Sequence, residues 1–254
     1  MSLANPSELF PFLESIGAAP KKGLSQNFLI DANIIRKIAT AADIQESETI
    51  LEIGPGPGAL TQELLRRKAR VIAVEKDPQF AQALHRFEGD LTVHCADILE
   101  FSLEQIPSPY KVVANLPYHI TTPILEKLCK TPPTVAYVMV QKEMADRMTA
   151  QSGSRAISSF TIFLQTFATL SIAAKVSRNC FFPSPSVDSA VVRLAFHPPA
   201  LSDPAPFLIW MRKAFNQRRK MLRSTLGIQI EPYAQMRPEA LSLQDWLALW
   251  AKVN

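Results

Sequence analysis

The chain has 254 residues, of which 47% are hydrophobic and 20% are charged, with a formal net charge of +4. This length and composition predict a folded protein with a buried core. The sequence contains no run of eighteen or more apolar residues, so we predict no membrane-spanning helix. The N-terminus lacks the pattern of a secretory signal, and the three cysteines have no disulfide or zinc-ligand spacing, so we expect a cytoplasmic protein without a metal.

Short apolar runs alternate with helical patterns along the first 197 residues. The candidate strands are Thr49 to Ile53, Val71 to Val74, Leu91 to His94, Lys111 to Ala114, Val135 to Val140 and Ser189 to Phe196. The candidate helices are Ala32 to Ala42, Ala59 to Arg67, Pro78 to Arg86, Ile124 to Cys129 and Ser158 to Thr169. This alternation predicts an α/β fold with a mostly parallel sheet covered on both faces.

A glycine-rich turn follows the first predicted strand. In the sequence EIGPGPGAL, Gly54, Gly56 and Gly58 allow close approach of a ligand, and Glu75 ends the second strand 21 positions after Gly54. This arrangement is typical of a site for an adenosine ribose, although such glycines also suit a turn without a ligand. The two prolines of the turn lack the N–H groups that hold a pyrophosphate, which favours S-adenosylmethionine over a dinucleotide.

Polar residues also follow the third and fourth predicted strands, at the same edge of the sheet. Asp97 can accept a hydrogen bond from an adenine amino group, and it can equally cap a helix. Asn115 ends an apolar run and precedes Leu116, Pro117 and Tyr118. The Asn115 side chain and the carbonyl before Pro117 can accept the N–H groups of a target adenine, and the Tyr118 ring can stack on a flipped-out base. A structural Asn-Pro turn with a core tyrosine is the alternative.

The positive charge is concentrated near the C-terminus. From residue 200 onward there are eight basic and four acidic residues, and this excess equals the net charge of the whole chain. Between Arg212 and Arg223 there are six basic residues and no acid, a pattern that favours phosphate binding, with a solvated basic helix as the alternative. A proline-rich linker at 196–207 precedes this part, which shows only helical patterns.

Eight segments, collinear over nearly the whole chain, carry a family resemblance. They are GLSQNFLID (23–31), LEIGPGPGALT (51–61), VEKD (74–77), AD (96–97), NLPYHITTPI (115–124), QKE (141–143), FFPSPSVDSAVVRL (181–194) and AFNQRRKMLRSTL (214–226). Together they resemble the ribosomal RNA adenine N6-dimethyltransferases. The last two segments are the most specific, and they point to the branch that modifies two adjacent adenosines near the 3′ end of small-subunit (16S) rRNA.

The resemblance implies a fold and a role for individual residues. It implies a Rossmann-like methyltransferase domain over 1–197, with a mostly parallel seven-stranded sheet and an N-terminal lid segment, and a small all-α RNA-binding domain over 198–254. In the cofactor site it implies that the methionine part is bound by Gln26, Asn27, Leu29 and Gly54. It implies that Glu75 binds the ribose, that Asp97 binds the adenine, and that Asn115 contacts both the cofactor and the target base. The implied catalytic residues are Asn115, Leu116, Pro117, Tyr118 and Phe181, with Phe182 as a neighbouring candidate for the second aromatic ring.

The basic residues Arg218, Arg219, Lys220 and Arg223 are predicted to lie on a helix and to bind RNA phosphates.

Three departures from the family pattern concern the lid and the two loops. Ser25 stands where the family usually has glycine, Pro57 where leucine is frequent, and His119 where asparagine is frequent. They put in doubt the fine geometry of the lid and loop exit, and leave the chemistry intact.

The implied activity is direct in-line transfer of methyl groups from S-adenosylmethionine to adenine N6, without a metal or a general base, by a monomer acting on immature small ribosomal subunits. Three alternatives are kept. One is the sister group that methylates a single adenosine of large-subunit rRNA, and another is a DNA adenine methyltransferase. The third is a ribosome-assembly factor whose catalysis is secondary.

Overall fold

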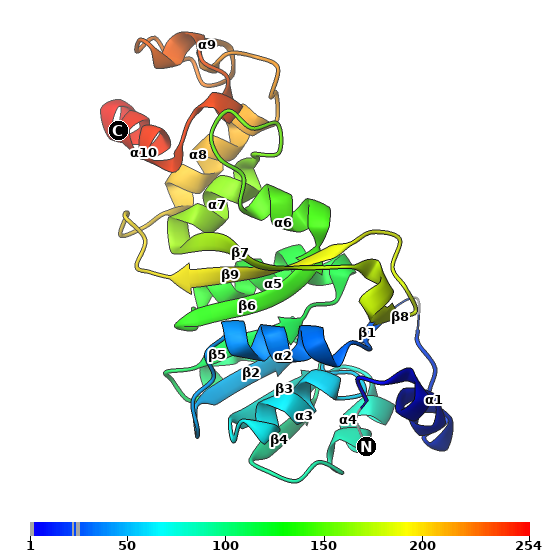
Figure 1. Ribbon diagram of the computed structural model, residues 1–254. Helices are drawn as coiled ribbons and strands as arrows, with labels where there is room; N and C mark the ends of the chain where they lie inside the picture. The colour runs from blue at the N-terminus through cyan, green and yellow to red at the C-terminus, as the bar shows by residue number, and fades with distance from the viewer. Residues whose placement is uncertain (1–2, 22, 24–25) are drawn as a thin grey trace. The chain divides into compact units, whose positions relative to one another are not determined.

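The structure, a computed structural model, describes residues 3–21, 23 and 26–254. Seven strands form one sheet in the order β4-β3-β2-β5-β6-β9-β7 (Figure 1). Their bounds are β2 Thr49–Ile53, β3 Arg70–Glu75, β4 Leu91–Cys95, β5 Lys111–Asn115, β6 Val135–Gln141, β7 Ala168–Val176 and β9 Ser189–Phe196. All six predicted strands are present, and the α/β, Rossmann-like architecture is confirmed.

The first five strands of that order run parallel, and β9 pairs antiparallel with β6. Strand β2 is buried at all five positions, as expected for a central parallel strand covered on both faces. Parallel pairing places the carboxyl ends of β2, β3, β4 and β5 at one edge of the sheet, where ligands bind in such folds.

The helices between the strands follow the predicted pattern closely. They are α2 Ala32–Ala41, α3 Ala59–Arg66, α4 Pro78–Leu84 and α5 Thr121–Lys130. Asp31 and Asp77 accept hydrogen bonds from the first N–H groups of α2 and α4, so local capping chemistry sets where these helices begin. Helices α2 and α3 lie side by side in front of the strands in Figure 1.

Several elements were not predicted. Helix α1 spans Pro6–Ser15, with Asn5 as its N-cap, and α6 spans Lys142–Met148. Two short strands, β1 (Phe28–Leu29) and β8 (Phe181–Phe182), form a separate antiparallel pair with Phe28 opposite Phe182 and Leu29 opposite Phe181. In Figure 1 this pair lies above α1. The predicted helix Ser158 to Thr169 is shorter, because α7 (Ser159–Phe167) gives way to β7.

The chain divides into two compact units. The first comprises Met1–Ala145 and Ser171–Phe196, and the second Asp146–Leu170 and His197–Asn254. The second unit is therefore discontinuous, and it includes a segment that the sequence placed in the methyltransferase domain. The sequence predicted a domain boundary between residues 197 and 198, and the chain re-enters the second unit at His197.

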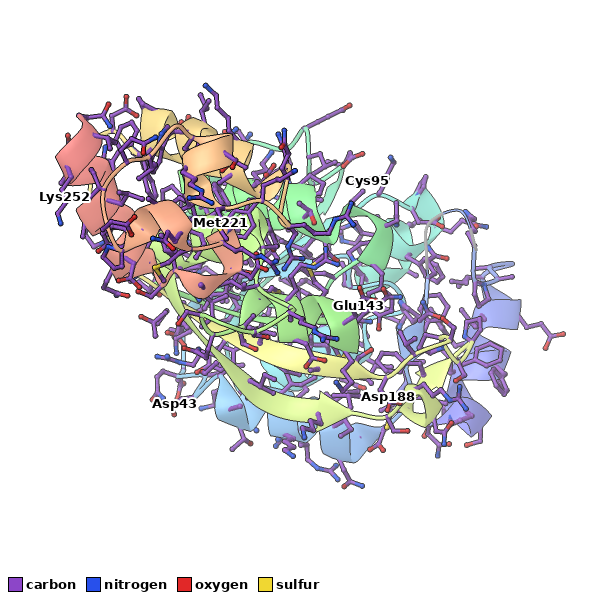
Figure 2. The ribbon with its side chains drawn as sticks, turned by 90° about the horizontal axis from the view of Figure 1, so that it is seen from above. Asp43, Cys95, Glu143, Asp188, Met221 and Lys252 are labelled. Atoms are coloured by element: carbon purple, nitrogen blue, oxygen red, sulfur yellow. The ribbon has the colours of Figure 1, made fainter. Side chains whose placement is uncertain are left out.

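The second unit is helical after residue 197. Its helices there are α8 Ala205–Phe215, α9 Leu222–Thr225 and α10 Leu243–Val253. Trp246 is fully buried, and its ring meets the Trp210 ring edge-on at 5.7 Å between centroids. Met221 and Lys252 mark this unit in Figure 2. Among the described residues no helix is long and apolar enough to cross a membrane.

Candidate functional site

One cavity lies beyond the carboxyl ends of the four parallel strands. The residues that line it at or just beyond the strand ends are Glu52, Ile53 and Gly54 of β2, Glu75 and Lys76 of β3, Ala96 and Asp97 of β4, and Asn115, Leu116, Pro117 and Tyr118 of β5. Gln26, Asn27, Phe28 and Leu29 complete it from the N-terminal side. The cavity thus brings together every predicted cofactor residue, and every predicted catalytic residue except Phe181.

The glycine-rich turn is shaped by Glu75. This carboxylate is 5% exposed and accepts hydrogen bonds from the backbone N–H groups of Gly56, at 2.9 Å, and Asp77, at 2.8 Å. Burial raises the pKa of Glu75, against the effect of these N–H donors. Each carboxylate oxygen accepts one of the two bonds and can accept another, so hydroxyl groups of a ribose find acceptors here.

Asp97 both lines the cavity and stabilises a local turn. Its Oδ1 accepts a hydrogen bond from the Leu99 N–H at 2.9 Å, and its Oδ2 pairs with Lys76 Nζ at 2.8 Å. The bond from Lys76 holds the pKa of the Asp97 carboxyl below its usual value. Asp97 can therefore both stabilise this turn and bind a ligand, because each of its oxygens accepts one of the two bonds and can accept another.

Asn115 is the last residue of β5, and the NH₂ group of its side-chain amide is hydrogen-bonded. Its Nδ2 donates to the Asn27 carbonyl at 3.1 Å, which joins the strand end to the lid segment. Its Oδ1 is buried and has no hydrogen-bond partner among the residues that the structure describes. Buried acceptors in folded proteins are nearly always paired, so this oxygen is suited to accept an N–H group from a bound molecule.

The tyrosine ring beside Asn115 is held at its far end. Tyr118 begins a short 3₁₀ turn, Tyr118–Ile120, and its hydroxyl is 2.8 Å from Ser189 Oγ, the first residue of β9. Burial raises the pKa of Tyr118, so the phenol is neutral at physiological pH. The hydrogen bond leaves the ring in one orientation at the cavity wall.

Phe181 does not line the cavity. Its ring is 3% exposed and lies in the main hydrophobic core, because β8 pairs it with Leu29. Phe182 is half-buried and meets the exposed Phe10 ring at 4.6 Å between centroids. In this structure, then, Phe181 is not placed to stack on a base, contrary to the expectation from the family motif. The loop after β8 is anchored through Asp188, labelled in Figure 2, whose Oδ1 accepts the Arg178 N–H at 3.0 Å.

Lys21 and Gln26 are tied to the start of α4. Gln26 Oε1 accepts the Lys21 N–H at 2.8 Å, and Lys21 Nζ pairs with Asp77 at 2.7 Å. The backbone N–H of Asp77 in turn donates to Glu75, which connects Lys21 and Gln26 to the Glu75 carboxylate. Of the three departures from the family pattern, Pro57 and His119 line the cavity, and Ser25 lies outside the described residues.

Sequence reasoning did not single out Leu3, Phe28 and Glu52, which line the cavity, or Asp77, which contacts Glu75 and Lys21. Glu52 is the most unusual of them, since it is 1% exposed, lines the cavity, and has an Oε2 without a partner. Burial raises its pKa to about 8. The sequence does contain a signal for Glu52, which is the one ionisable residue in the buried strand TILEI. Glutamate is rarely fully buried without a partner, so such a residue is a candidate for a functional role.

The predicted basic helix is interrupted, so Arg218, Arg219, Lys220 and Arg223 do not lie on one helix. Residues 216–221 form a turn between α8 and α9, so Arg218, Arg219 and Lys220 lie on that turn and Arg223 on α9. Helix α8 ends at its C-cap Asn216, and tertiary hydrogen bonds favour the turn that follows: the Arg218 guanidinium donates to the carbonyls of Arg155 and Ile157 at 3.0 and 2.8 Å. All four basic side chains belong to exposed residues.

No group of three or more histidine, cysteine, aspartate or glutamate side chains in the described ranges is placed to hold a metal ion. Carboxylates at the ends of β3 and β4 and an unpaired amide oxygen at the end of β5 are instead suited to a polar organic molecule with several N–H and O–H groups. An adenosine-containing cofactor and an adenine target both have this chemistry.

Comparisons with known proteins agree with this arrangement. The profile of a family described as ribosomal RNA adenine dimethylase matches residues 18–237. The chain is 47% identical to the ribosomal RNA small subunit methyltransferase A of Protochlamydia amoebophila, across 98% of this chain and 97% of that one. It is 43% identical to the protein of the same name from Chlamydia caviae, across 98% of each chain.

Two solved structures share the fold over most of their length. A dimethyladenosine transferase from Plasmodium falciparum superposes with a TM-score of 0.79 at 26% identity, covering 89% of this chain and 97% of that one. The 23S rRNA methyltransferase ErmE superposes with a TM-score of 0.73 at 28% identity, covering 89% and 99%. The profile match includes every residue of the cavity lining except Leu3.

Proposed function

The chain belongs to the ribosomal RNA adenine dimethylase family, and from that premise we propose how its cavity carries out the reaction. The protein is an S-adenosylmethionine-dependent rRNA adenine dimethyltransferase that acts on adenosines of small-subunit rRNA. The observation that carries the assignment of the site is the unpaired Oδ1 of Asn115, in the cavity that also contains Glu75 and Asp97.

The cavity fits the cofactor. We assign Glu75 to the ribose hydroxyls, Asp97 to the adenine amino group, and Gln26, Asn27, Leu29 and Gly54 to the methionine part. Bound S-adenosylmethionine supplies an electrophilic methyl group. Because Pro55 and Pro57 offer no N–H groups to a phosphate, the turn suits a cofactor without a pyrophosphate.

Asn115 and its neighbours position the target amine. The lone pair of an adenine amino group is delocalised into the ring, so the amine attacks poorly unless its N–H groups are held. The Asn115 Oδ1 and the Leu116 carbonyl accept those N–H groups, and Pro117 keeps the two acceptors in place. Positive charge develops on N6 as the methyl group transfers, and both acceptors stabilise it without moving. The proton is then lost to water.

The target base stacks on the Tyr118 ring, which the bond to Ser189 holds in place. The second aromatic partner expected from the family motif is Phe181 or Phe182. Phe182 is the more accessible of the two in this structure, and Phe181 reaches a base only if β8 shifts.

The substrate, we propose, is the pair of adjacent adenosines near the 3′ end of 16S rRNA, within an immature small subunit in the cytoplasm, approached by a monomer. Relatives at 43–47% identity carry the small-subunit name, which favours this substrate over the large-subunit rRNA of ErmE. The exposed Arg219, Lys220 and Arg223 supply phosphate contacts in the second unit.

The test is the Asn115→Ala variant. We expect turnover on undermethylated small subunits to fall about a hundredfold or more, because a preorganised acceptor is lost where charge develops. Binding of S-adenosylhomocysteine should change much less, since Glu75 and Asp97 remain. Labelled S-adenosylmethionine and mass spectrometry of the rRNA give the rate and the modified positions.

Asn33→Ala is the matched control, because Asn33 is an exposed amide on α2 away from the cavity. Near-normal methylation by Asn115→Ala would remove Asn115 from the mechanism. Methylation of large-subunit rRNA alone would favour the sister group. If Asn115→Ala restores subunit maturation in cells without methylating, occupancy of the subunit is the main function and catalysis is secondary.

A further inference from the structure

Helix α1 precedes the segment that matches the family profile, yet it contributes to the cofactor cavity. The match begins at residue 18, and α1 spans Pro6–Ser15. Leu3, just before the helix, is 1% exposed and lines the cavity. Leu3 also belongs to a hydrophobic cluster with Leu9, Phe12 and Leu13 of α1. This N-terminal part is therefore built into the wall of the site.

The same hydrophobic cluster contains a ring that touches the glycine-rich turn. Phe28 is a member of the cluster, lines the cavity, and packs edge-on against Phe80 at 5.2 Å between centroids. A Cβ placed on Gly56 would lie 3.3 Å from the Phe28 ring, so ring and turn are in close contact. Loosening α1 removes packing from behind this ring.

Arg86 links α1 to the other end of the turn. It follows α4, and its Nη2 donates to the carbonyl of Pro57 at 2.6 Å. Its Nη1 donates to the Ala83 carbonyl at 2.9 Å, near the end of α4. The guanidinium carbon lies 3.8 Å from the Phe12 ring centroid and 4.4 Å from that of Phe87. One planar cation thus contacts α1, α4 and the turn.

The partners of Arg86 are unusual for an arginine. Among the described residues no carboxylate forms an ion pair with it, and its two polar contacts are backbone carbonyls. Hydrogen bonds from a charged donor are stronger than those from a neutral one, and a guanidinium over an aromatic face gains further stabilisation. A lysine could not donate to both carbonyls while stacking flat on a ring.

We propose that α1 is a working part of the cofactor site, and that Arg86 is a positioning residue that Phe12 holds against the Pro57 carbonyl. By fixing that carbonyl, Arg86 fixes the end of the glycine-rich turn and the start of α3. Leu3 and Phe28 hold the turn from the cavity side. This inference rests on the proposed cofactor role of the cavity.

The experiment compares five variants of the full chain by calorimetric binding of S-adenosylhomocysteine and by thermal unfolding. Arg86→Met keeps an apolar body and removes the donor to Pro57, and we expect binding to weaken about tenfold, the scale of a lost charge-assisted hydrogen bond. Arg86→Lys keeps the cation and should recover part of that loss. Phe12→Leu keeps the core apolar, removes the ring, and should weaken binding about fivefold.

Leu128→Ala is the matched control. Leu128 is 1% exposed, lies on α5, and belongs neither to the hydrophobic cluster of α1 nor to the described lining of the cavity. It should lower the unfolding temperature at least as much as Phe12→Leu, yet leave binding within about twofold, because the link through Arg86 remains. A double variant, Phe12→Leu with Arg86→Met, should bind no more weakly than Arg86→Met alone, since both changes break one link.

The outcomes are distinguishable. If the wild-type protein does not bind S-adenosylhomocysteine, the proposed cofactor role of the cavity fails. If the wild type binds and Arg86→Met binds equally well, the positioning role is overturned while the cofactor role stands. If affinity follows unfolding temperature across all variants, Leu128→Ala included, α1 acts only through stability and the proposal is also overturned.

Discussion

At the scale of single residues, the site depends on polar groups that the fold buries without full compensation. Asn115 Oδ1 and Glu52 Oε2 are both buried and unpaired, and both belong to residues that line the same cavity. Leaving such groups unpaired costs stability, commonly about 1–3 kcal/mol for each group. A protein retains this cost where the groups serve a bound molecule rather than the fold.

Glu52 leads to a prediction about pH. Its pKa is about 8 in the folded protein because of burial, against 4.5 for an exposed glutamate. Between these values the folded state holds a proton that the unfolded state has lost, so raising the pH favours unfolding. We expect the free energy of unfolding to fall by up to about 1.4 kcal/mol per pH unit in this window, and Glu52→Gln to remove that contribution.

Denaturant unfolding of the wild type and of Glu52→Gln between pH 5 and pH 8 measures the difference. Glu75 has a pKa raised in the same direction, but it is present in both proteins and cancels. Glu63→Gln is the control, because the bond from Arg66 lowers the pKa of Glu63, which moves its contribution to pH values below this window. Parallel stability curves for wild type and Glu52→Gln would contradict a proton held at Glu52.

Residues at strand ends were largely predictable, because parallel strands must end together. Glu75, Asp97 and Asn115 each follow an apolar run, and that position alone brings them to one edge of the sheet. Leu3 and Phe28 could not be predicted, because their places depend on the packing of α1 and of the two-residue strand β1, for which no periodic pattern exists. Burial of Phe181 depends likewise on the pairing of β1 with β8.

At the scale of elements, the glycine-rich turn is constrained at its last glycine. Gly58 is the N-cap of α3 and has a φ of 96°. A Cβ there would overlap the Phe87 ring and come within 2.8 Å of Leu84 Cδ2. The start of α3 therefore approaches the end of α4 so closely that only glycine fits.

We expect Gly58→Ala to lower the free energy of unfolding by roughly 2–4 kcal/mol, from a strained backbone and an overpacked contact together. Gly17→Ala is the matched control, because Gly17 has a φ of 62° and nothing lies within 4 Å of a Cβ there. That change should cost only the backbone strain, roughly 1–2 kcal/mol. Equal losses in denaturant unfolding would show that the contact with Phe87 relaxes freely.

Two element predictions were wrong for identifiable reasons. The apolar pattern of α7 continues past Phe167 without a glycine or proline, so nothing in the sequence indicates that β7 begins at Ala168. The basic run after α8 has high helix propensity, but tertiary hydrogen bonds from Arg218 to a distant segment favour a turn. In both cases tertiary contacts decide the structure, and they are not visible in a local pattern.

At the scale of the whole molecule, the two units divide the labour that we propose. The cavity lies in the first unit, and the basic residues lie in the second. Arg218 differs from its neighbours because its guanidinium is bonded to Arg155 and Ile157 carbonyls within the second unit. Arg219 and Arg223 are thus the better candidates for RNA contacts, although they do not share a helix.

We expect Arg219→Gln with Arg223→Gln to weaken binding to immature small subunits and to lower the slope of log affinity against log salt by roughly 0.7–0.9 per lost phosphate contact. Binding of S-adenosylhomocysteine should be unchanged. Lys252→Gln, an exposed change at the far end of α10, serves as the control. An unchanged salt slope for the double variant would place the RNA-binding surface elsewhere.

The discontinuity of the second unit also restricts how genes for such proteins can recombine. Helix α7 contacts α8 and α10, yet it is encoded before residues 171–196, which contain β9 and belong to the first unit. A single crossover near residue 197 would join foreign α8 and α10 to a native α7, and their facing apolar surfaces would not match. Exchange of the complete second unit would need a crossover near residue 197 and two more, one on each side of residues 146–170. We therefore expect this lineage to change its RNA-reading surface by point substitution rather than by exchange of modules.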